Sequence, residues 1–301
     1  MRTLPILGRV RTRLQVGQVP AEHTPLDDDV AERIDLASDI LAGRRTAVLT
    51  GAGISTDSGI PDYRSPGSPP RTPMTLEMFL SSPEFRRHYW ARNHLGWRHM
   101  DAALPNPAHL ALTGLQDQGR VSAVITQNVD MLHTKAGTRG VLELHGCYGR
   151  VRCLRCDWRV SRHRLAQQLE EINTGFAERV AGRGAIEVAP DADATLADTS
   201  DFRMIDCPHC GGILKPDIVY FGETVPKPLV EQSFSAVDEA DALLVVGSSL
   251  TVMSGLRFAR RAHRAGKPLI IVNRGHTRAD ELASLKIDHR AGVVLPALEN
   301  R

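Results

Sequence analysis

The chain has 301 residues, of which 42% are hydrophobic and 24% are charged, enough for one large domain or two modest ones with real cores. The formal net charge of +2 argues against long-range attraction to nucleic acid. No apolar run approaches the roughly 20 residues that span a membrane. We therefore expect no direct contact with nucleic acid or with a membrane.

Residues 1–19 carry four arginines and no acidic residue, but they lack an apolar stretch followed by a small-residue cleavage site. Secretion is therefore not expected. The whole chain has 32 arginines and 5 lysines, a bias typical of GC-rich bacterial genes. We predict a cytoplasmic bacterial protein in which residues 1–26 form an N-terminal tail.

Hydrophobic spacing predicts strands that alternate with helices. In chain order, the predicted elements are a helix over 30–41, a strand over 47–50, a helix over 105–118, strands over 121–126 and 242–246, a helix over 254–265 and a strand over 268–272. The strands are continuous apolar runs, as expected for a parallel sheet covered on both faces. The predicted fold class is α/β, with a Rossmann-like doubly wound parallel sheet.

A glycine-rich turn, Gly51-Ala52-Gly53, follows the first predicted strand. Such a turn lets backbone N–H groups approach a phosphate. The sixth position, Thr56, is not glycine, and no second strand ending in an acidic residue follows about 20 residues later, unlike in dehydrogenases. The turn is therefore predicted to bind a nucleotide but not to serve ordinary hydride transfer.

Four of the five cysteines form two C-x-x-C pairs, Cys153 with Cys156 and Cys207 with Cys210. In a protein that is not secreted, this pattern favours a metal over disulfides. Four thiolates complete a closed tetrahedral zinc site without a position for water, so the zinc is predicted to be structural. The alternative is a redox dithiol, against which the presence of two pairs argues. Cys147 has no partner and is predicted to be a packing residue.

Two stretches interrupt the alternation of strands and helices. Residues 62–104 are rich in proline, aromatic residues and arginine, and residues 147–215 contain both cysteine pairs. We predict that they form the helical and the zinc-binding parts of a smaller second domain. The Rossmann-like domain would then consist of 27–61, 105–146 and 216–301.

The chain also resembles a known family. Gly51-Ala52-Gly53-Ile54-Ser55, continued by Ser58-Gly59-Ile60-Pro61-Asp62-Tyr63-Arg64, is similar to the signature loop of the sirtuins, the NAD-dependent protein deacylases. The resemblance covers roughly residues 27–297 and is closest to the class II branch. Further matching blocks, in the family's order, are Thr126-Gln127-Asn128-Val129-Asp130, Leu144-His145-Gly146, the two C-x-x-C pairs, Val219-Tyr220-Phe221-Gly222-Glu223, Gly247-Ser248-Ser249-Leu250 and Val272-Asn273.

The resemblance implies a protein-lysine deacylase that consumes NAD and releases nicotinamide and O-acyl-ADP-ribose. His145 would be the base that activates a ribose hydroxyl, a role suited to an imidazole. Asn128 and Asp130 would be further catalytic residues. The implied NAD contacts are Gly51, Ala52, Gly53, Ser55, Thr56, Ile60, Pro61, Asp62, Tyr63, Arg64, Gln127, Asn128, Gly247, Ser248, Ser249, Asn273, Arg274 and Ala291.

The resemblance also implies a substrate site. Val219, Phe221, Gly222 and Leu250 would belong to the two edges between which an extended acyl-lysine peptide or protein segment is bound. In strand addition of this kind the peptide is recognised through its backbone hydrogen bonds, so many peptide sequences can bind.

Tyr89 and Arg92 lie one helical turn apart and would face the same direction. In desuccinylating sirtuins such a pair grips the carboxylate of an acidic acyl group, which an arginine matches in a bidentate manner. The alternative is an ordinary basic helix face.

Two other functions remain open. The same cleft could transfer ADP-ribose to a protein. The chain could also be a zinc module that binds nucleic acid without catalysis, but its near-neutral charge argues against this function.

Overall fold

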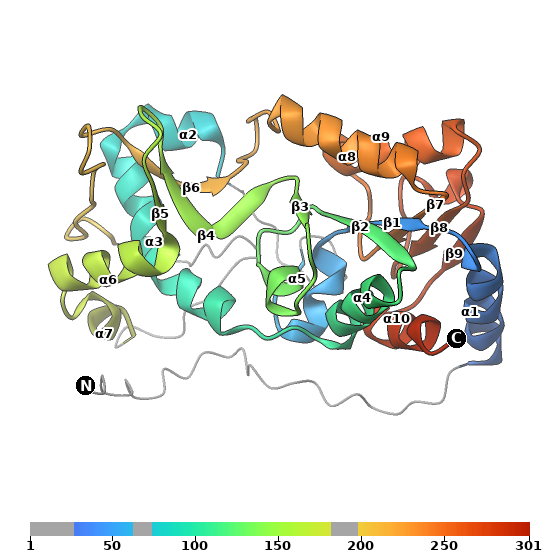
Figure 1. The fold of residues 1–301 in the computed structure, drawn as a ribbon. Helices are drawn as coiled ribbons and strands as arrows, with labels where there is room; N and C mark the ends of the chain where they lie inside the picture. The colour runs from blue at the N-terminus through green and yellow to red at the C-terminus, as the bar shows by residue number, and fades with distance from the viewer. Residues whose placement is uncertain (1–26, 63–73, 182–197) are drawn as a thin grey trace.

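The structure is a computed structural model that describes residues 27–62, 74–181 and 198–301, so the predicted tail 1–26 lies outside the described residues. Its larger lobe is built on a six-stranded, entirely parallel sheet with the order β3-β2-β1-β7-β8-β9, which confirms the predicted α/β class (Figure 1). The strands are β1 (Thr46–Thr50), β2 (Val121–Thr126), β3 (Leu142–Glu143), β7 (Ala242–Val246), β8 (Leu269–Val272) and β9 (Leu285–Ile287).

Strand β1 shows why helices cover both faces of this sheet. All five of its residues are buried, and successive side chains point to opposite faces. Val48 packs in the cluster that contains residues of α1, α4 and α10, whereas Ala47 and Leu49 pack in the cluster of α8 and α9. Figure 1 shows these two sets of helices on opposite sides of the sheet. Their bounds are α1 (Asp28–Leu41), α4 (Pro107–Asp117), α8 (Lys227–Glu239), α9 (Met253–Arg264) and α10 (Ala291–Glu299).

Local sequence fixes where α4 begins. The Asn106 side chain accepts a hydrogen bond from the Ala108 N–H, and His109 completes a capping box with it. Pro107 occupies the first helical position, where its missing N–H costs nothing. The helix therefore begins two residues later than the predicted start at residue 105.

The order of the strands reverses between β1 and β7, because the chain first moves from β1 toward β2 and β3 and later returns to the other side of β1. In open parallel sheets, ligands bind at the carboxyl ends of the strands at such a switch point. Gly51 and Gly247, which directly follow β1 and β7, both lie there. Short helices around this edge and elsewhere in the large lobe are η1 (Ala52–Ile54), η2 (Thr56–Ser58), α5 (Leu132–Lys135) and η3 (Asp280–Leu282).

The smaller lobe contains a three-stranded antiparallel sheet in the order β5-β4-β6, which the sequence patterns did not predict. Its strands are β4 (Gly146–Cys153), β5 (Arg159–Ser161) and β6 (Leu214–Ile218). Strand β6 extends three residues past the boundary that we predicted at residue 215. The helices of this lobe are α2 (Leu76–Ser81), α3 (Pro83–Ala102), α6 (Arg162–Ile172) and α7 (Phe176–Ala181).

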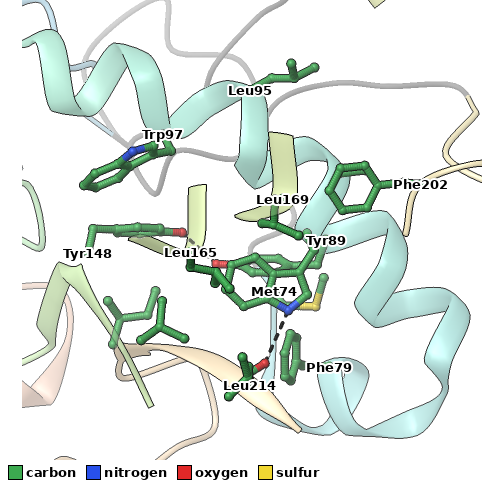
Figure 2. Close-up of a cluster of buried hydrophobic side chains, with 14 of the residues drawn as sticks. Met74, Phe79, Tyr89, Leu95, Trp97, Tyr148, Leu165, Leu169, Phe202 and Leu214 are labelled. Carbon is green, nitrogen blue, oxygen red and sulfur yellow. Dashed lines mark hydrogen bonds between the residues drawn. The ribbon is translucent and has the colours of Figure 1, made fainter. Parts of the chain in front are cut away.

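An aromatic cluster fills the core of the small lobe (Figure 2). Phe79 of α2 meets the ring of Tyr89 of α3 edge to face at 5.4 Å, and Tyr220 packs against both. The Trp90 indole donates a hydrogen bond to the Leu214 carbonyl of β6. These contacts join α2 and α3 to the antiparallel sheet, so the two predicted excursions from the large sheet share one core. Within the described residues, the structure has no helix of the length and apolar character that a membrane crossing requires.

Candidate active site

Two glycine turns meet at the switch point of the large sheet. The Gly53 N–H donates to the Gly247 carbonyl at 2.8 Å, and the Gly51 N–H donates to the Val246 carbonyl at 3.0 Å. A Cβ on Gly53 would lie 2.9 Å from the Gly247 Cα, and a Cβ on Gly247 would lie 2.2 Å from the Ile54 nitrogen. Only glycines therefore allow the loops after β1 and β7 to touch.

These turns form one wall of a cleft with a volume of about 1010 Å³, which runs between the large sheet and the small lobe. The catalytic candidates His145, Asn128 and Asp130 line it, as do Val219, Phe221 and Gly222 among the substrate candidates. The predicted NAD contacts that line it are Gly51, Ala52, Gly53, Ser55, Ile60, Asp62, Gln127, Asn128, Gly247, Ser248, Ser249, Asn273 and Arg274.

Of the other predicted contacts, the structure describes Thr56, Pro61, Ala291 and Leu250 but does not place them in the lining of the cleft. The Thr56 hydroxyl instead donates a hydrogen bond of 3.1 Å to the Gly53 carbonyl, which stabilises the glycine turn. Ala291 and Leu250 are buried in the two hydrophobic clusters of the large lobe, so Ala291 is a core residue at the start of α10. Pro61 follows Ile60 without joining the wall. Tyr63 and Arg64 lie outside the described residues.

The structure does not bring Tyr89 and Arg92 into the cleft. Tyr89 is only 1% exposed, and its hydroxyl lies 2.7 Å from that of Tyr148 in the small-lobe core (Figure 2). A guanidinium nitrogen of Arg92 lies 3.0 Å from the ring nitrogen Nε2 of His88. The side chain of Tyr89 is thus buried in the core of the small lobe, whereas Arg92 is half-buried beside His88.

His145 lies in the two-residue turn between β3 and β4, and its ring is hydrogen-bonded on two sides. Its Nδ1 lies 2.8 Å from the Gln127 carbonyl oxygen, and its Nε2 lies 2.8 Å from the Ser254 hydroxyl. Because a carbonyl can only accept, Nδ1 carries the proton of the neutral ring and Nε2 has the free lone pair. His145 is therefore arranged as a proton acceptor at Nε2.

The surroundings of His145 favour its neutral form. Burial lowers the pKa of the imidazole below its ordinary 6.5, and the Arg257 guanidinium lowers it further, while the bond to Gln127 acts in the opposite direction. Removing a charged ring from water is costly, and a nearby positive charge disfavours a second one. The ring can thus act as a base at neutral pH.

A hydrogen-bonded group joins the loop after β1 to the loop after β2. The Ser55 hydroxyl donates to the Asp130 carboxylate at 2.6 Å and accepts from the Asn128 amide at 3.1 Å. The same amide donates to the Gly51 carbonyl at 3.1 Å. Burial raises the pKa of Asp130, but the bonds from Ser55 and from the Leu132 N–H oppose this rise. Asn128 and Asp130 therefore hold the glycine turn against the strand edge.

Several cleft residues were missed by the sequence analysis: Ser254, Arg257, His276 and Asp288. Ser254 and Arg257 lie in the first turn and a half of α9. The predicted helix over 254–265 contained both, and because it follows a strand whose carboxyl end reaches the switch point, its first turn could have been assigned to the cleft.

The four paired cysteines come together at the far end of the small sheet. Their sulfur atoms lie within 4.8 Å of one another, with Cys153 and Cys210 at 3.6 Å and Cys156 and Cys207 at 3.7 Å. Sulfurs bound to one tetrahedral zinc at about 2.3 Å are roughly 3.8 Å apart, whereas disulfide sulfurs are about 2.05 Å apart. The arrangement fits one structural zinc. Cys147 is not part of this cluster, as predicted.

Comparisons with known proteins agree with this geometry. The sequence pattern described as the Sir2 family matches residues 51–254. NAD-dependent protein deacetylase 1 of Mycobacterium avium (strain 104) is 60% identical, covering 86% of this chain and 92% of the relative. The enzyme of the same name from Streptomyces coelicolor (strain ATCC BAA-471 / A3(2) / M145) is 49% identical, covering 92% and 93%.

Solved structures lead to the same family. A structure of a Sir2 protein with a p53 peptide and NAD+ superimposes with a TM-score of 0.69 at 32% identity, covering 87% of this chain and 95% of the other. The chain therefore belongs to the Sir2 family, as the sequence resemblance implied.

The zinc site can be tested by removing one ligand. Cys207→Ser should abolish zinc binding and lower the melting temperature, since zinc contributes roughly 10–16 kcal/mol to the folding of zinc-finger peptides. Zinc content by atomic emission and thermal unfolding would measure both effects. Cys147→Ser is the matched control and should keep one zinc per chain. Retention of zinc by Cys207→Ser would contradict the assignment.

The electrostatic influence of Arg257 can be tested by titration. In Arg257→Gln, the pKa of His145 should rise, because a positive charge that disfavours the imidazolium is gone. NMR titration of the ring measures the midpoint directly. Arg260→Gln removes an exposed charge from the same helix and should leave the midpoint unchanged. An unchanged midpoint in Arg257→Gln would show that its charge does not act on His145.

Proposed function

We propose that this protein is an NAD-dependent protein-lysine deacylase, which consumes NAD and an acyl-lysine protein and releases nicotinamide, the free lysine side chain and O-acyl-ADP-ribose. The observation that carries the proposal is the position of His145, a neutral base whose Nε2 faces a cleft formed by two glycine turns at the sheet's switch point. The membership of the Sir2 family supports it.

The cleft residues fit a dinucleotide. At Gly51 and Gly53 a Cβ would already strike Gly247 or Ser248, so the turn presents bare backbone to its ligand. Gln127 and Ser248 are bonded to each other at 2.7 Å near His145, whereas Asn273 and Arg274 lie after β8. We assign the first pair to the nicotinamide ribose and the phosphates, and the second pair to the adenosine.

Bound NAD would supply the ribose carbon that receives the acyl oxygen when nicotinamide leaves. The task of His145 is then to take a proton at Nε2 from a ribose hydroxyl, which becomes the nucleophile toward the acyl group. Asn128 and Asp130 keep the glycine turn in place through Ser55, so that hydroxyl and base can meet. The ring does not need to turn, because Nδ1 stays bonded to Gln127.

The substrate site is proposed between two edges of the cleft, 219–222 and 249–252. Phe221 is 44% exposed and Met253, beside the second edge, is 48% exposed, so both offer apolar surface to a bound peptide. An extended peptide that carries the acyl-lysine would cover them and pair through its backbone. Because a reducing compartment keeps the four thiolates free for zinc, we place the protein in the bacterial cytoplasm.

The proposal is tested by following nicotinamide release from NAD with a panel of acetyl-, propionyl-, succinyl-, glutaryl- and lipoyl-lysine peptides, with product masses. Loss of the acyl group from lysine together with formation of O-acyl-ADP-ribose is expected. A peptide or protein that gains the mass of ADP-ribose would instead indicate the transferase function. No nicotinamide release with any peptide would refute the deacylase assignment.

His145→Ala should abolish deacylation while leaving NAD binding largely intact. General-base catalysis contributes about 10²–10⁴-fold to a rate, so the turnover number should fall by at least that factor. Product masses and NAD binding by calorimetry would separate the two effects. His163→Ala, which removes an exposed imidazole on α6, is the matched control. Full activity in His145→Ala would exclude it as the base.

A further inference from the structure

The first turn of α9 packs against the catalytic base. Ser254 is the second residue of this helix, and its hydroxyl lies 2.8 Å from His145 Nε2, the atom that must take the proton. The two residues are 109 positions apart in the chain, so the contact is created by the fold. It occupies the side of the ring opposite the Gln127 carbonyl.

Ser254 does not serve its own helix in a capping role. The N-cap of α9 is Val252, and no side chain caps this helix end. A serine within the first turn of a helix commonly satisfies nearby backbone groups, but here its hydroxyl is bonded to an imidazole on another element. The residue is therefore explained by its contact with His145 and not by the local structure of α9.

The next residue, Gly255, makes this contact possible. A Cβ at Gly255 would lie 2.6 Å from the Gln127 side-chain oxygen and 2.8 Å from its Cδ, so a larger residue here would displace the Gln127 amide. Gln127 in turn accepts from His145 Nδ1 through its backbone and donates to the Ser248 hydroxyl through its side chain. The first turn of α9 therefore contacts both residues of the Gln127–His145 pair, with Ser254 against His145 and Gly255 against Gln127.

We propose that Ser254 is a positioning residue that keeps Nε2 of His145 aimed into the cleft before and after proton transfer. The inference rests on the proposed function, since it assigns Ser254 a part in the same reaction. A hydroxyl both donates and accepts hydrogen bonds. In the ligand-free protein it donates to the lone pair of the neutral ring. When a ribose hydroxyl approaches Nε2 it replaces Ser254 as the donor, and after the ribose proton has moved to Nε2 the Ser254 hydroxyl can rotate to accept from the new Nε2–H. Gln127 and Ser254 then hold the ring in the free enzyme and after the proton has moved.

The charged groups near the ring are compatible with this role. Arg257 lies one turn further along α9, and Asp130 and Glu223 are the carboxylates that line the cleft on the elements beside His145. Both oxygens of Asp130 already accept bonds, from Ser55 and Leu132, and Glu223 is bonded to Arg152 and Lys215. Neither carboxylate is hydrogen-bonded to the imidazole, which leaves Ser254 as the side-chain partner that the described residues provide at Nε2.

The test compares Ser254→Thr with Ser254→Val, which have the same shape and differ in the hydroxyl, together with Ser254→Ala. Ser254→Val and Ser254→Ala should lower kcat for deacylation about 10-fold, the order expected when a hydrogen bond of about 1.4 kcal/mol is lost. The KM for NAD and the first-turnover release of nicotinamide should stay unchanged, because these precede the proton transfer. Ser254→Thr should restore most of kcat. Thr174→Ala removes an exposed hydroxyl from the small lobe and should have no effect.

A second measurement uses the ligand-free protein. In the 15N spectrum of the imidazole, Nε2 should move in Ser254→Val toward the value of a ring nitrogen that accepts no hydrogen bond, and Ser254→Thr should return it. Equal kcat and equal 15N shifts in the Thr and Val variants would overturn the inference. If the wild type released no nicotinamide, the proposed function would fail, while the 15N comparison would still decide whether Ser254 orients the ring.

Discussion

The backbone contact between Gly53 and Gly247 is the constraint on which the site depends. It joins the loops after two neighbouring parallel strands at the point where the strand order reverses, and there is no room for a side chain at either residue. The contact brings the Ser55 hydroxyl within reach of Asn128 and Asp130, and it places Ser248 beside Gln127. A larger residue at either turn would separate the loops that carry these groups.

From this contact, hydrogen bonds extend to the base in a short series. Ser248 accepts from the Gln127 side chain, and the Gln127 backbone accepts from His145. Helix α9, which follows β7 and the Gly247 turn, packs against the Gln127 side chain at Gly255. Three segments far apart in the sequence therefore determine the position of one ring. Because each bond fixes a group that the next bond uses, the imidazole can be oriented without a carboxylate partner.

Much of the large lobe could be predicted from the sequence, because its strands are continuous apolar runs and its glycine turns carry a recognisable pattern. His145 and the cysteine pairs were likewise predictable from short motifs. Ser254 was not, since its partner is 109 residues away and helical spacing says nothing about such a contact. For Tyr89, helical spacing predicted the face of the helix on which the residue lies but not the burial of its side chain. That burial results from packing against Phe79 and Tyr220. The antiparallel strands were missed because charged residues interrupt their apolar pattern, such as Arg152, whose partner Glu223 lies 71 positions away.

These same strands explain how a zinc site remote from the cleft contributes to it. Strand β4 begins immediately after His145 and ends at Cys153, a length along the strand of about 23 Å at about 3.3 Å per residue. Its partner β6 begins near the thiolates, where Leu214 pairs with Cys153, and ends at Ile218, just before the proposed substrate edge. At the cleft end, the Val219 N–H donates to the His145 carbonyl at 2.8 Å, and the buried Lys215 is bonded to Glu223 at 2.8 Å. The two strands thus tie the base and the substrate edge together at one end, and zinc closes the other. Without the metal, the pairing of β4 with β6 would no longer be fixed at the zinc end. The distance between His145 and the substrate edge would then no longer be fixed either.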